Sequence, residues 1–302
     1  MNRRKLNEVS IKPVITANKY SKKNVRAYDY YPEPYANVCL LARKKSGKST
    51  VIYRALEQCC KKGTNVCVFS PTCLIDPTYI KMKKMLEKKG CNVMFKEHFI
   101  EDGVNLVSEL YNAIKDGEED EDDIQDIEIE DIKPPLFIFG NDRRFIQEQN
   151  PDGSVELTPK PQTKQKAKEK KKKKKEKLLT PEHIFVFDDL SQEMRNPSIS
   201  RMLVKNRHIK CKVFLSCHSV NNLDRMALES IDAYHVFGNI PDEKIKELQD
   251  KINLTFKSDT KKQSKLQQLY DDATSKPYNF LYIDRANCTF RKNFNELYNV
   301  DE

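Results

Sequence analysis

The sequence predicts an α/β fold in which helices flank a mainly parallel central sheet. Short apolar runs alternate along the chain with stretches whose apolar residues recur at helical spacing. A strand, a helix and a second strand in succession imply a parallel sheet with right-handed crossovers. The first apolar run, residues 38–41, shows no polar alternation, which is typical of a central strand covered on both faces.

A candidate phosphate-binding loop follows this strand directly. Residues 42–49 fit the pattern G-x-x-x-x-G-K-S/T at Gly47, Lys48 and Ser49, with Ala42 in the place of the first glycine. Such a loop turns backbone N–H groups toward phosphate oxygens, while its lysine contacts the β/γ-phosphates and its serine binds Mg²⁺. The apolar spacing that follows predicts a helix whose N-terminus faces the anion. The predicted nucleotide-binding residues are Ala42, Arg43, Lys44, Lys45, Ser46, Gly47, Lys48, Ser49 and Thr50.

A second motif supplies the acids that a nucleotide-hydrolysing site requires. The apolar strand predicted at 184–187 ends in Asp188 and Asp189. We expect Asp188 to hold Mg²⁺ opposite Ser49, and Asp189 to orient or deprotonate the attacking water. Together the two motifs predict a P-loop NTPase fold of the RecA/ASCE type, with a nucleotide as substrate and Mg²⁺ as cofactor.

The remaining elements complete the predicted sheet. Strands are expected over 65–70, 92–95 and 211–216, and a helix over 104–114. The helix between the first two of these strands has an apolar face made of Ile80, Met82, Met85 and Leu86.

Polar residues near the last of these strands are candidates for the catalytic site. Asn196 and Pro197 predict the start of a helix that ends near Arg207. The strand over 211–216 follows, and either Ser216 or His218 at its end is the candidate that senses the γ-phosphate.

The composition divides the chain into four segments. An arm rich in tyrosine and lysine (1–35) precedes the first part of the NTPase core (36–115), and a charged insertion (116–179) separates it from the second part (180–302). Long blocks of like charge repel themselves, so we expect the insertion to be largely disordered from Asp116 to Lys177 apart from the apolar stretch near Phe137. We also expect it to carry one hairpin, and Pro151-Asp152-Gly153 predicts a turn.

Charge favours a polyanionic partner. Residues 116–131 hold eleven acidic and no basic residues, whereas 160–177 hold eleven lysines and two glutamates. The net charge of +9 therefore leaves about +11 on the rest of the chain once the runs of −11 and +9 are set aside. This excess suits nucleic acid, although solubility alone also explains basic surfaces.

The compartment is expected to be intracellular. No apolar run approaches the length of a membrane span, and the first residues lack the hydrophobic stretch of a signal peptide. Most of the nine cysteines lie inside apolar runs without C-x-x-C spacing, which predicts free thiols and no zinc site.

Several motifs together resemble the FtsK–HerA superfamily, and most of all the genome-packaging ATPases of large DNA viruses and Maverick/Polinton elements. The similar stretches are the strand ends at 70–72 and 187–190, the run 206–208, and the strands 213–218 and 278–284. The family differs in having a glycine in the place of Ala42 and a glutamine near Cys217 and His218.

The resemblance implies a homo-oligomeric ring that hydrolyses ATP to move double-stranded DNA into a capsid. The resemblance gives Asp189 the water-activating role and makes Arg207 a candidate charge stabiliser, while His218 at the end of the strand over 211–216 is the third predicted catalytic residue. Capsid portal or vertex proteins would be partners, no membrane is implied, and the location would be a viral factory, the virion or the host nucleus. Two alternatives stay open: a nucleotide-binding structural subunit that hydrolyses poorly, and another P-loop enzyme such as a kinase.

Overall fold

A computed structural model describes residues 20–122, 145–149, 155–159, 178–190, 192–254, 256 and 264–300 of the 302-residue chain. The chain forms two compact units. The first comprises residues 1–111 and 177–302, and the second comprises residues 112–176.

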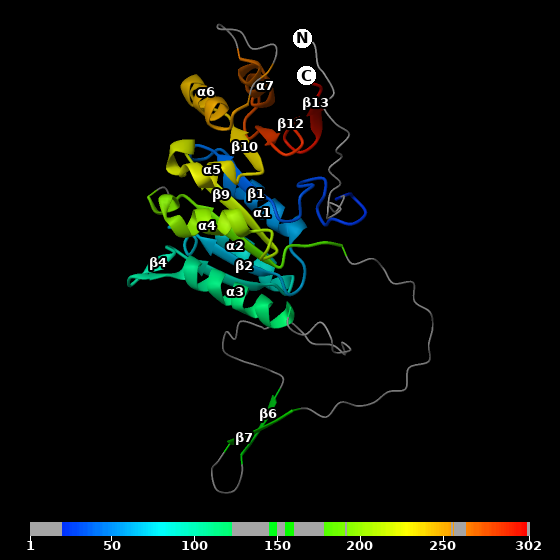
Figure 1. The fold of residues 1–302 in the computed structure, drawn as a ribbon, viewed down its shortest axis with the longest axis vertical. Helices are drawn as coiled ribbons and strands as arrows, with labels where there is room; N and C mark the ends of the chain where they lie inside the picture. Colours follow the sequence, from blue (N-terminus) through cyan, green and yellow to red (C-terminus); the bar gives the residue numbers. More distant parts are fainter. Residues whose placement is uncertain are drawn as a thin grey trace, which may run out of the picture. The chain divides into compact units, whose positions relative to one another are not determined.

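The first unit is built on a mixed sheet in which nine described strands take the order β13-β12-β11-β10-β1-β9-β8-β2-β3 (Figure 1). The strands from β10 to β3 in this order pair in parallel, and β11, β12 and β13 extend the sheet as antiparallel strands. The prediction of a mainly parallel sheet is thereby confirmed. The bounds are β1 (Asn37–Leu41), β2 (Asn65–Phe69), β3 (Asn92–Lys96), β8 (His183–Asp188), β9 (Cys211–Cys217), β10 (Ala233–Phe237), β11 (Phe280–Asp284), β12 (Thr289–Lys292) and β13 (Glu296–Tyr298).

Helices connect the strands and cover the sheet. The first ones follow the predicted alternation, because β1, α1, β2, α2 and β3 succeed one another in the chain. Two short 3₁₀ helices, η1 (Glu193–Arg195) and η2 (Val220–Asn222), lie in loops after β8 and β9. The α-helices are α1 (Lys48–Cys59), α2 (Pro77–Lys88), α3 (Leu106–Asp122), α4 (Pro197–Lys205), α5 (Arg225–Glu229), α6 (Asp242–Lys251) and α7 (Lys265–Ala273).

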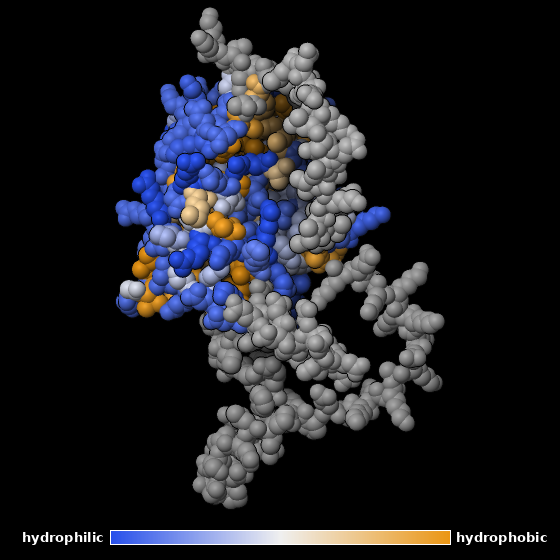
Figure 2. Space-filling model, in the orientation of Figure 1, coloured by the Kyte–Doolittle hydropathy of each residue, from blue (hydrophilic) through white to orange (hydrophobic). Residues whose placement is uncertain are grey.

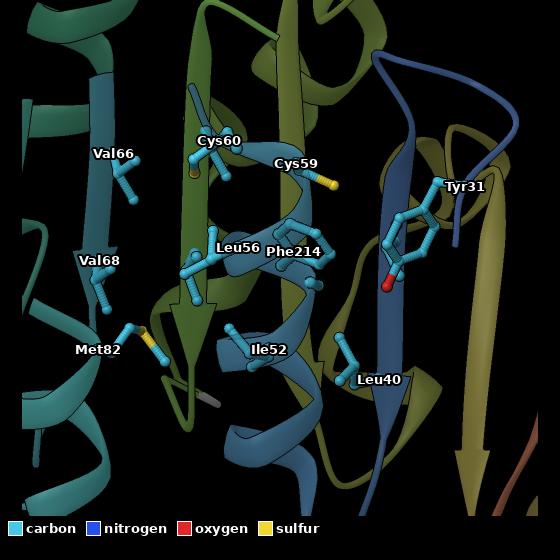
Figure 3. Close-up of a cluster of buried hydrophobic side chains, with 14 of the residues drawn as sticks. Tyr31, Leu40, Ile52, Leu56, Cys59, Cys60, Val66, Val68, Met82 and Phe214 are labelled. Atoms are coloured by element: carbon cyan, nitrogen blue, oxygen red, sulfur yellow. The ribbon is translucent and has the colours of Figure 1, made fainter. Parts of the chain in front are cut away.

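One hydrophobic core joins α1 and α2 to a face of the sheet. Ile52 and Leu56 of α1 and Met82 of α2 are fully buried against strand residues such as Leu40 and Val68 (Figure 3). Each large apolar side chain buried in this way contributes about 1.5–3 kcal/mol. This packing fixes the start of α1 over the end of β1, where the loop with the phosphate-binding pattern lies.

The described part of the N-terminal arm is also built into this core. Tyr31 is 1% exposed and stacks on the ring of His235, with 5.7 Å between the ring centroids. The Lys212 ammonium lies 4.6 Å from the Tyr31 ring centroid and donates to the Glu33 carbonyl at 2.9 Å. Burial lowers the pKa of Lys212, and it lowers the pKa of His235 to about 3, so this histidine stays neutral.

Two details of the predicted helices are wrong. Ile80 is 40% exposed, and Tyr79 takes the buried position on α2. Val104 lies in a strand because Asp102 and Gly103, with φ of 51° and 80°, form the turn of a small hairpin. The two strands of that hairpin are β4 (Ile100–Glu101) and β5 (Val104–Asn105), and α3 begins only after them.

The second unit contains the hairpin expected in the insertion. β6 (Phe145–Gln149) and β7 (Val155–Pro159) pair as antiparallel strands, and the predicted turn at 151–153 lies outside the described residues. Both charge runs fall mainly outside the described residues, although α3 continues to Asp122. The expected disorder is therefore wrong for residues 116–122, which continue α3. For the rest of the segment it stays a prediction, and the apolar stretch near Phe137 lies outside the described residues.

The visible face of the described surface is mainly hydrophilic, with small separate hydrophobic patches (Figure 2). None of the helices in the described ranges combines the length and apolarity that a membrane span requires. The nine cysteines are free thiols, and eight of them are buried.

Candidate active site at the carboxyl edge of the sheet

The residues of both motifs meet at one edge of the sheet. β1, β9 and β8 are adjacent and parallel, so their carboxyl ends lie together. In register, Leu41 pairs with Cys217, and Ser216 pairs with Asp188. The phosphate-binding loop, the acid pair and the end of β9 therefore face one another, which is the usual place for a ligand in an open α/β sheet.

The loop has the backbone that phosphate binding requires. Gly47 has φ of 95° and forms the N-cap of α1, a conformation that side chains with a Cβ rarely adopt. Ala42 continues from β1, donates its N–H to the Cys217 carbonyl at 3.1 Å and keeps a negative φ. The first glycine of the pattern is therefore not needed here, because this position has ordinary strand-like backbone. The Ser46 hydroxyl oxygen is buried and finds no hydrogen-bond partner among the described residues.

Lys48 lies between the two acids that end β8. Its Nζ is 2.9 Å from Asp188 Oδ1 and 3.2 Å from Asp189 Oδ1. Lys48 and Asp188 are buried, and Asp189 is about one-third exposed. Asp189 has φ of 61°, which Asp tolerates better than most residues, and this turn takes the chain out of the strand. The predicted phosphate lysine and the predicted catalytic acids are thus brought into direct contact.

His218 joins the same group from the end of β9. Its Nε2 lies 2.9 Å from Asp189 Oδ1, and its Nδ1 lies 2.6 Å from the Ala42 carbonyl oxygen. A carboxylate and a carbonyl oxygen only accept hydrogen bonds, so both contacts are satisfied when both ring nitrogens carry protons. Ser216, the other sensor candidate, lies beside Asp188, and its buried Oγ has no hydrogen-bond partner in the described ranges.

Tyr79 is a site residue that the sequence interpretation missed. Its hydroxyl donates a short hydrogen bond to Asp188 Oδ2, and the hydroxyls of Ser49 and Ser70 lie within hydrogen-bonding reach. Burial, followed by the charge of Asp188, raises the pKa of Tyr79, so the phenol keeps its proton. The acceptor is 109 residues away in the chain, and a local pattern therefore contains no signal for this contact.

The donor set fits a magnesium ion of the kind that accompanies nucleotides. Ser49 offers a hydroxyl and Asp188 a carboxylate, and both interact with the Tyr79 hydroxyl. Asp188 Oδ1 is buried and accepts no hydrogen bond within the described residues, because Lys48 approaches it at an angle unsuited to one. Mg²⁺ prefers such oxygen ligands and takes its remaining ones from water and phosphates. Among the described residues there is no cluster of three His, Cys, Asp or Glu side chains that would form a separate metal cage.

Arg207 is not brought to the site of its own chain. It precedes β9, whereas Asp188 ends β8, so the two lie at opposite edges of a parallel pair. The seven residues of β9 correspond to about 23 Å at 3.3 Å per residue. Its guanidinium instead pairs with Asp232 at 3.0 Å and lies 3.8 Å from Glu33. Any contact between Arg207 and bound nucleotide would have to be made with another copy of the chain.

Two further residues border the loop. Lys244 of α6 donates to the His218 carbonyl at 3.3 Å and helps to line a cavity of about 450 Å³ with Arg43 and Lys44. Tyr278 packs on Gly47, since a Cβ at that glycine would lie 3.3 Å from the Tyr278 ring. A different cavity, lined by Glu33, Asp232 and tyrosines of the arm, lies by Arg207 at the opposite edge and holds none of the predicted site residues.

The ion pairs make a prediction about stability. Lys48→Met removes the ammonium but keeps most of the side-chain volume, and it leaves the buried Asp188 without its cation. Breaking a buried pair in this way costs about 3–5 kcal/mol of unfolding free energy. Urea denaturation should show this loss and a partial recovery in Lys48→Met/Asp188→Asn. Lys62→Met, at an exposed lysine, serves as control. A Lys48→Met protein as stable as wild type would contradict a stabilising ion pair between Lys48 and Asp188.

Comparison with solved structures finds proteins whose chains superpose on this fold. Solved structures with a similar arrangement include the genome packaging NTPase B204 from Sulfolobus turreted icosahedral virus 2 in complex with AMP. It is 13% identical, with 89% of this chain and 100% of that chain covered and a TM-score of 0.48. B204, the DNA-packaging ATPase from Sulfolobus turreted icosahedral virus, is 14% identical, with 89% and 99% covered and a TM-score of 0.48. EssC (ATPases 2 and 3) from Geobacillus thermodenitrificans is 9% identical, with 83% and 38% covered and a TM-score of 0.43.

Sequence comparison gives the family. No curated protein sequence matches the chain. The profile of the family described as Poxvirus A32 protein matches residues 137–293, which include both acids, Arg207 and His218 but not the phosphate-binding loop. Because this match spans more than half of the 302 residues, the chain belongs to the poxvirus A32 protein family.

Proposed function

We propose that the chain is an ATPase that drives double-stranded DNA into a viral capsid. The observation that carries the proposal is the contact of Lys48, at the N-terminus of α1, with the two acids that end β8. A lysine in a phosphate-binding loop beside a metal-binding and a water-activating carboxylate is the set of groups that hydrolysis of a nucleoside triphosphate requires. Membership of a poxvirus family and the resemblance to packaging ATPases support the DNA substrate.

The geometry indicates how the residues would act. The backbone N–H groups before α1 bind the β- and γ-phosphates, and Lys48 turns from the carboxylates to the phosphate oxygens. Asp189, released from Lys48, accepts the proton of the attacking water, whose oxygen bonds to the γ-phosphorus as the bond to the ADP oxygen breaks. Ser49 and Asp188 would hold Mg²⁺, which neutralises charge on the phosphates when bound. His218 holds Asp189 in place.

The contact of His218 with Asp189 also favours a second candidate function, that of a structural subunit. His218 stands near the position where the resembling ATPases have glutamine, and its contact occupies the water-activating carboxylate. A structural subunit that binds nucleotide and hydrolyses it poorly would have such an arrangement. The first prediction below separates the two functions.

We expect Asp189→Asn to keep Mg·ATP binding and to lower kcat by about 10²–10⁴-fold, because only proton acceptance by the carboxylate is lost. Steady-state ATPase assays, with nucleotide affinity measured in parallel, test this. Asp250→Asn, which removes an exposed carboxylate on α6, is the matched control. Wild-type turnover no faster than that of Asp189→Asn would favour the poorly hydrolysing subunit.

Duplex DNA, a ring of identical subunits and capsid portal or vertex proteins are the partners proposed for this activity. Arg207 is 57% exposed at the edge opposite the acids, where a neighbouring subunit in a ring could receive it as a charge stabiliser. An intracellular location in a viral factory, the host nucleus or the virion goes with this function.

DNA binding should depend steeply on salt. The basic excess of about +11 outside the charge runs would contact phosphates without sequence preference. Each neutralised phosphate contributes about −0.9 to the slope of log K against log salt, so six or more contacts give a slope of roughly −5 or steeper. Fluorescence anisotropy with two unrelated duplexes measures this slope, and a flat dependence would argue against DNA.

The same preparation tests assembly. If a subunit completes its neighbour's site, the ATPase rate per subunit should rise with protein concentration, and duplex DNA should increase it further. Arg207→Ala should lower the rate at high concentration and leave nucleotide affinity unchanged. A rate that depends on neither dilution nor DNA would favour a self-contained P-loop enzyme.

A further inference from the structure

Tyr79 brings a hydroxyl into the site from a helix that carries none of the predicted site residues. α2 begins with Pro77, and its N-cap Asp76 accepts a hydrogen bond from the Thr78 N–H. This start fixes the first turn of the helix against the sheet. Tyr79, the third helical residue, is 1% exposed, and its ring belongs to the core shared with α1.

The two oxygens of Asp188 have different neighbours. Oδ2 accepts from the Tyr79 hydroxyl, whereas Oδ1 lies 2.9 Å from Lys48 Nζ. Hydrogen bonds to ionised acceptors are about twice as strong as neutral ones. Because the donor is attached to a ring locked in the core, this bond sets the plane of the carboxylate and decides which oxygen faces the phosphate-binding loop.

The hydroxyl also lies where three elements of the site meet. Ser49 is in the first turn of α1, Ser70 directly follows β2, and Asp188 ends β8, and all three side chains are within reach of it. β2 pairs with β8, so the segment after β2 lies next to the acid pair. A single phenol thus connects the serine and the carboxylate that were assigned to Mg²⁺.

We propose that Tyr79 is a positioning residue for the divalent-cation site, holding Asp188 Oδ2 so that Oδ1 stays turned toward the loop where Mg²⁺ and nucleotide bind. This inference rests on the proposed function. Lys48 leaves Oδ1 when it turns to the phosphates, whereas the bond from Tyr79 to Oδ2 involves no phosphate and is kept. Tyr79 therefore keeps the freed oxygen in the orientation that the metal needs.

The test measures how binding of a fluorescent ADP analogue depends on Mg²⁺, without relying on turnover. Tyr79→Phe removes only the hydroxyl. We expect its half-saturating Mg²⁺ concentration to rise about tenfold, the lower end of the effect found when a residue that orients a metal ligand is changed. Affinity measured in EDTA should be unchanged. Tyr111→Phe, which alters another buried tyrosine outside the site, should behave as wild type.

A double variant tests whether Tyr79 acts through Asp188 or only stabilises the fold. In Asp188→Asn, which lacks the carboxylate that Tyr79 orients, adding Tyr79→Phe should not change the half-saturating Mg²⁺ concentration further. A Tyr79→Phe protein with lowered melting temperature but wild-type Mg²⁺ dependence would overturn the inference, as would tighter Mg²⁺ binding. If wild type binds no nucleotide, the proposed function fails and the inference falls with it. If wild type binds nucleotide and Tyr79→Phe has the same half-saturating Mg²⁺ concentration as wild type, the proposed function stands and the inference alone is wrong.

Discussion

The contact of Lys48 with Asp188 and Asp189 is the interaction on which the rest of the site depends. Buried charges persist in a protein only when they are paired and hydrogen-bonded. Here Lys48 lies beside both acids, His218 contacts Asp189, and Asp188 receives a further hydrogen bond from Tyr79. In the proposed mechanism, the phosphates of the nucleotide replace the acids as partners of Lys48, which holds the acids in place until then. The same ion pairs therefore stabilise the folded chain and keep the acids ready for reaction.

The sheet is arranged so that these groups meet. β1, β9 and β8 lie side by side, and residues of the site lie at or directly after their carboxyl ends at the same edge. The core formed by α1 and α2 fixes the two helices whose first turns carry Lys48, Ser49 and Tyr79. The antiparallel strands from β11 to β13 extend the sheet beyond β10, and Tyr278, just before β11, packs on Gly47. The end of the loop at Gly47 thus contacts the segment before β11, while Arg43, Lys44 and Lys45 stay exposed.

Much of this was predictable because the signals are local. A glycine, a lysine and a serine after an apolar run, and a pair of acids after another, each report on one strand end, and the parallel topology brings the strand ends together. Contacts between distant segments leave no such signal. A buried tyrosine usually needs a hydrogen-bond partner for its hydroxyl. Asp188, the partner of Tyr79, is far away in the sequence, so the local pattern favours Ile80 over Tyr79 as the core residue. The position of Arg207 could be deduced from the sequence. Arg207 precedes β9 and Asp188 ends β8, and because these two strands are parallel, the start of one and the end of the other lie at opposite edges of the sheet.

The central claim is that Lys48 exchanges its carboxylate partners for the phosphates of a nucleoside triphosphate. Isothermal titration of ATPγS in the presence of Mg²⁺ into wild type, Lys48→Met and Lys62→Met measures this exchange directly, once each protein is shown to be folded. The account predicts one saturable site in wild type and in Lys62→Met. Loss of a charge-assisted contact to phosphate should weaken binding about 10–100-fold or more in Lys48→Met. Equal affinity in all three proteins would contradict the assignment of the loop.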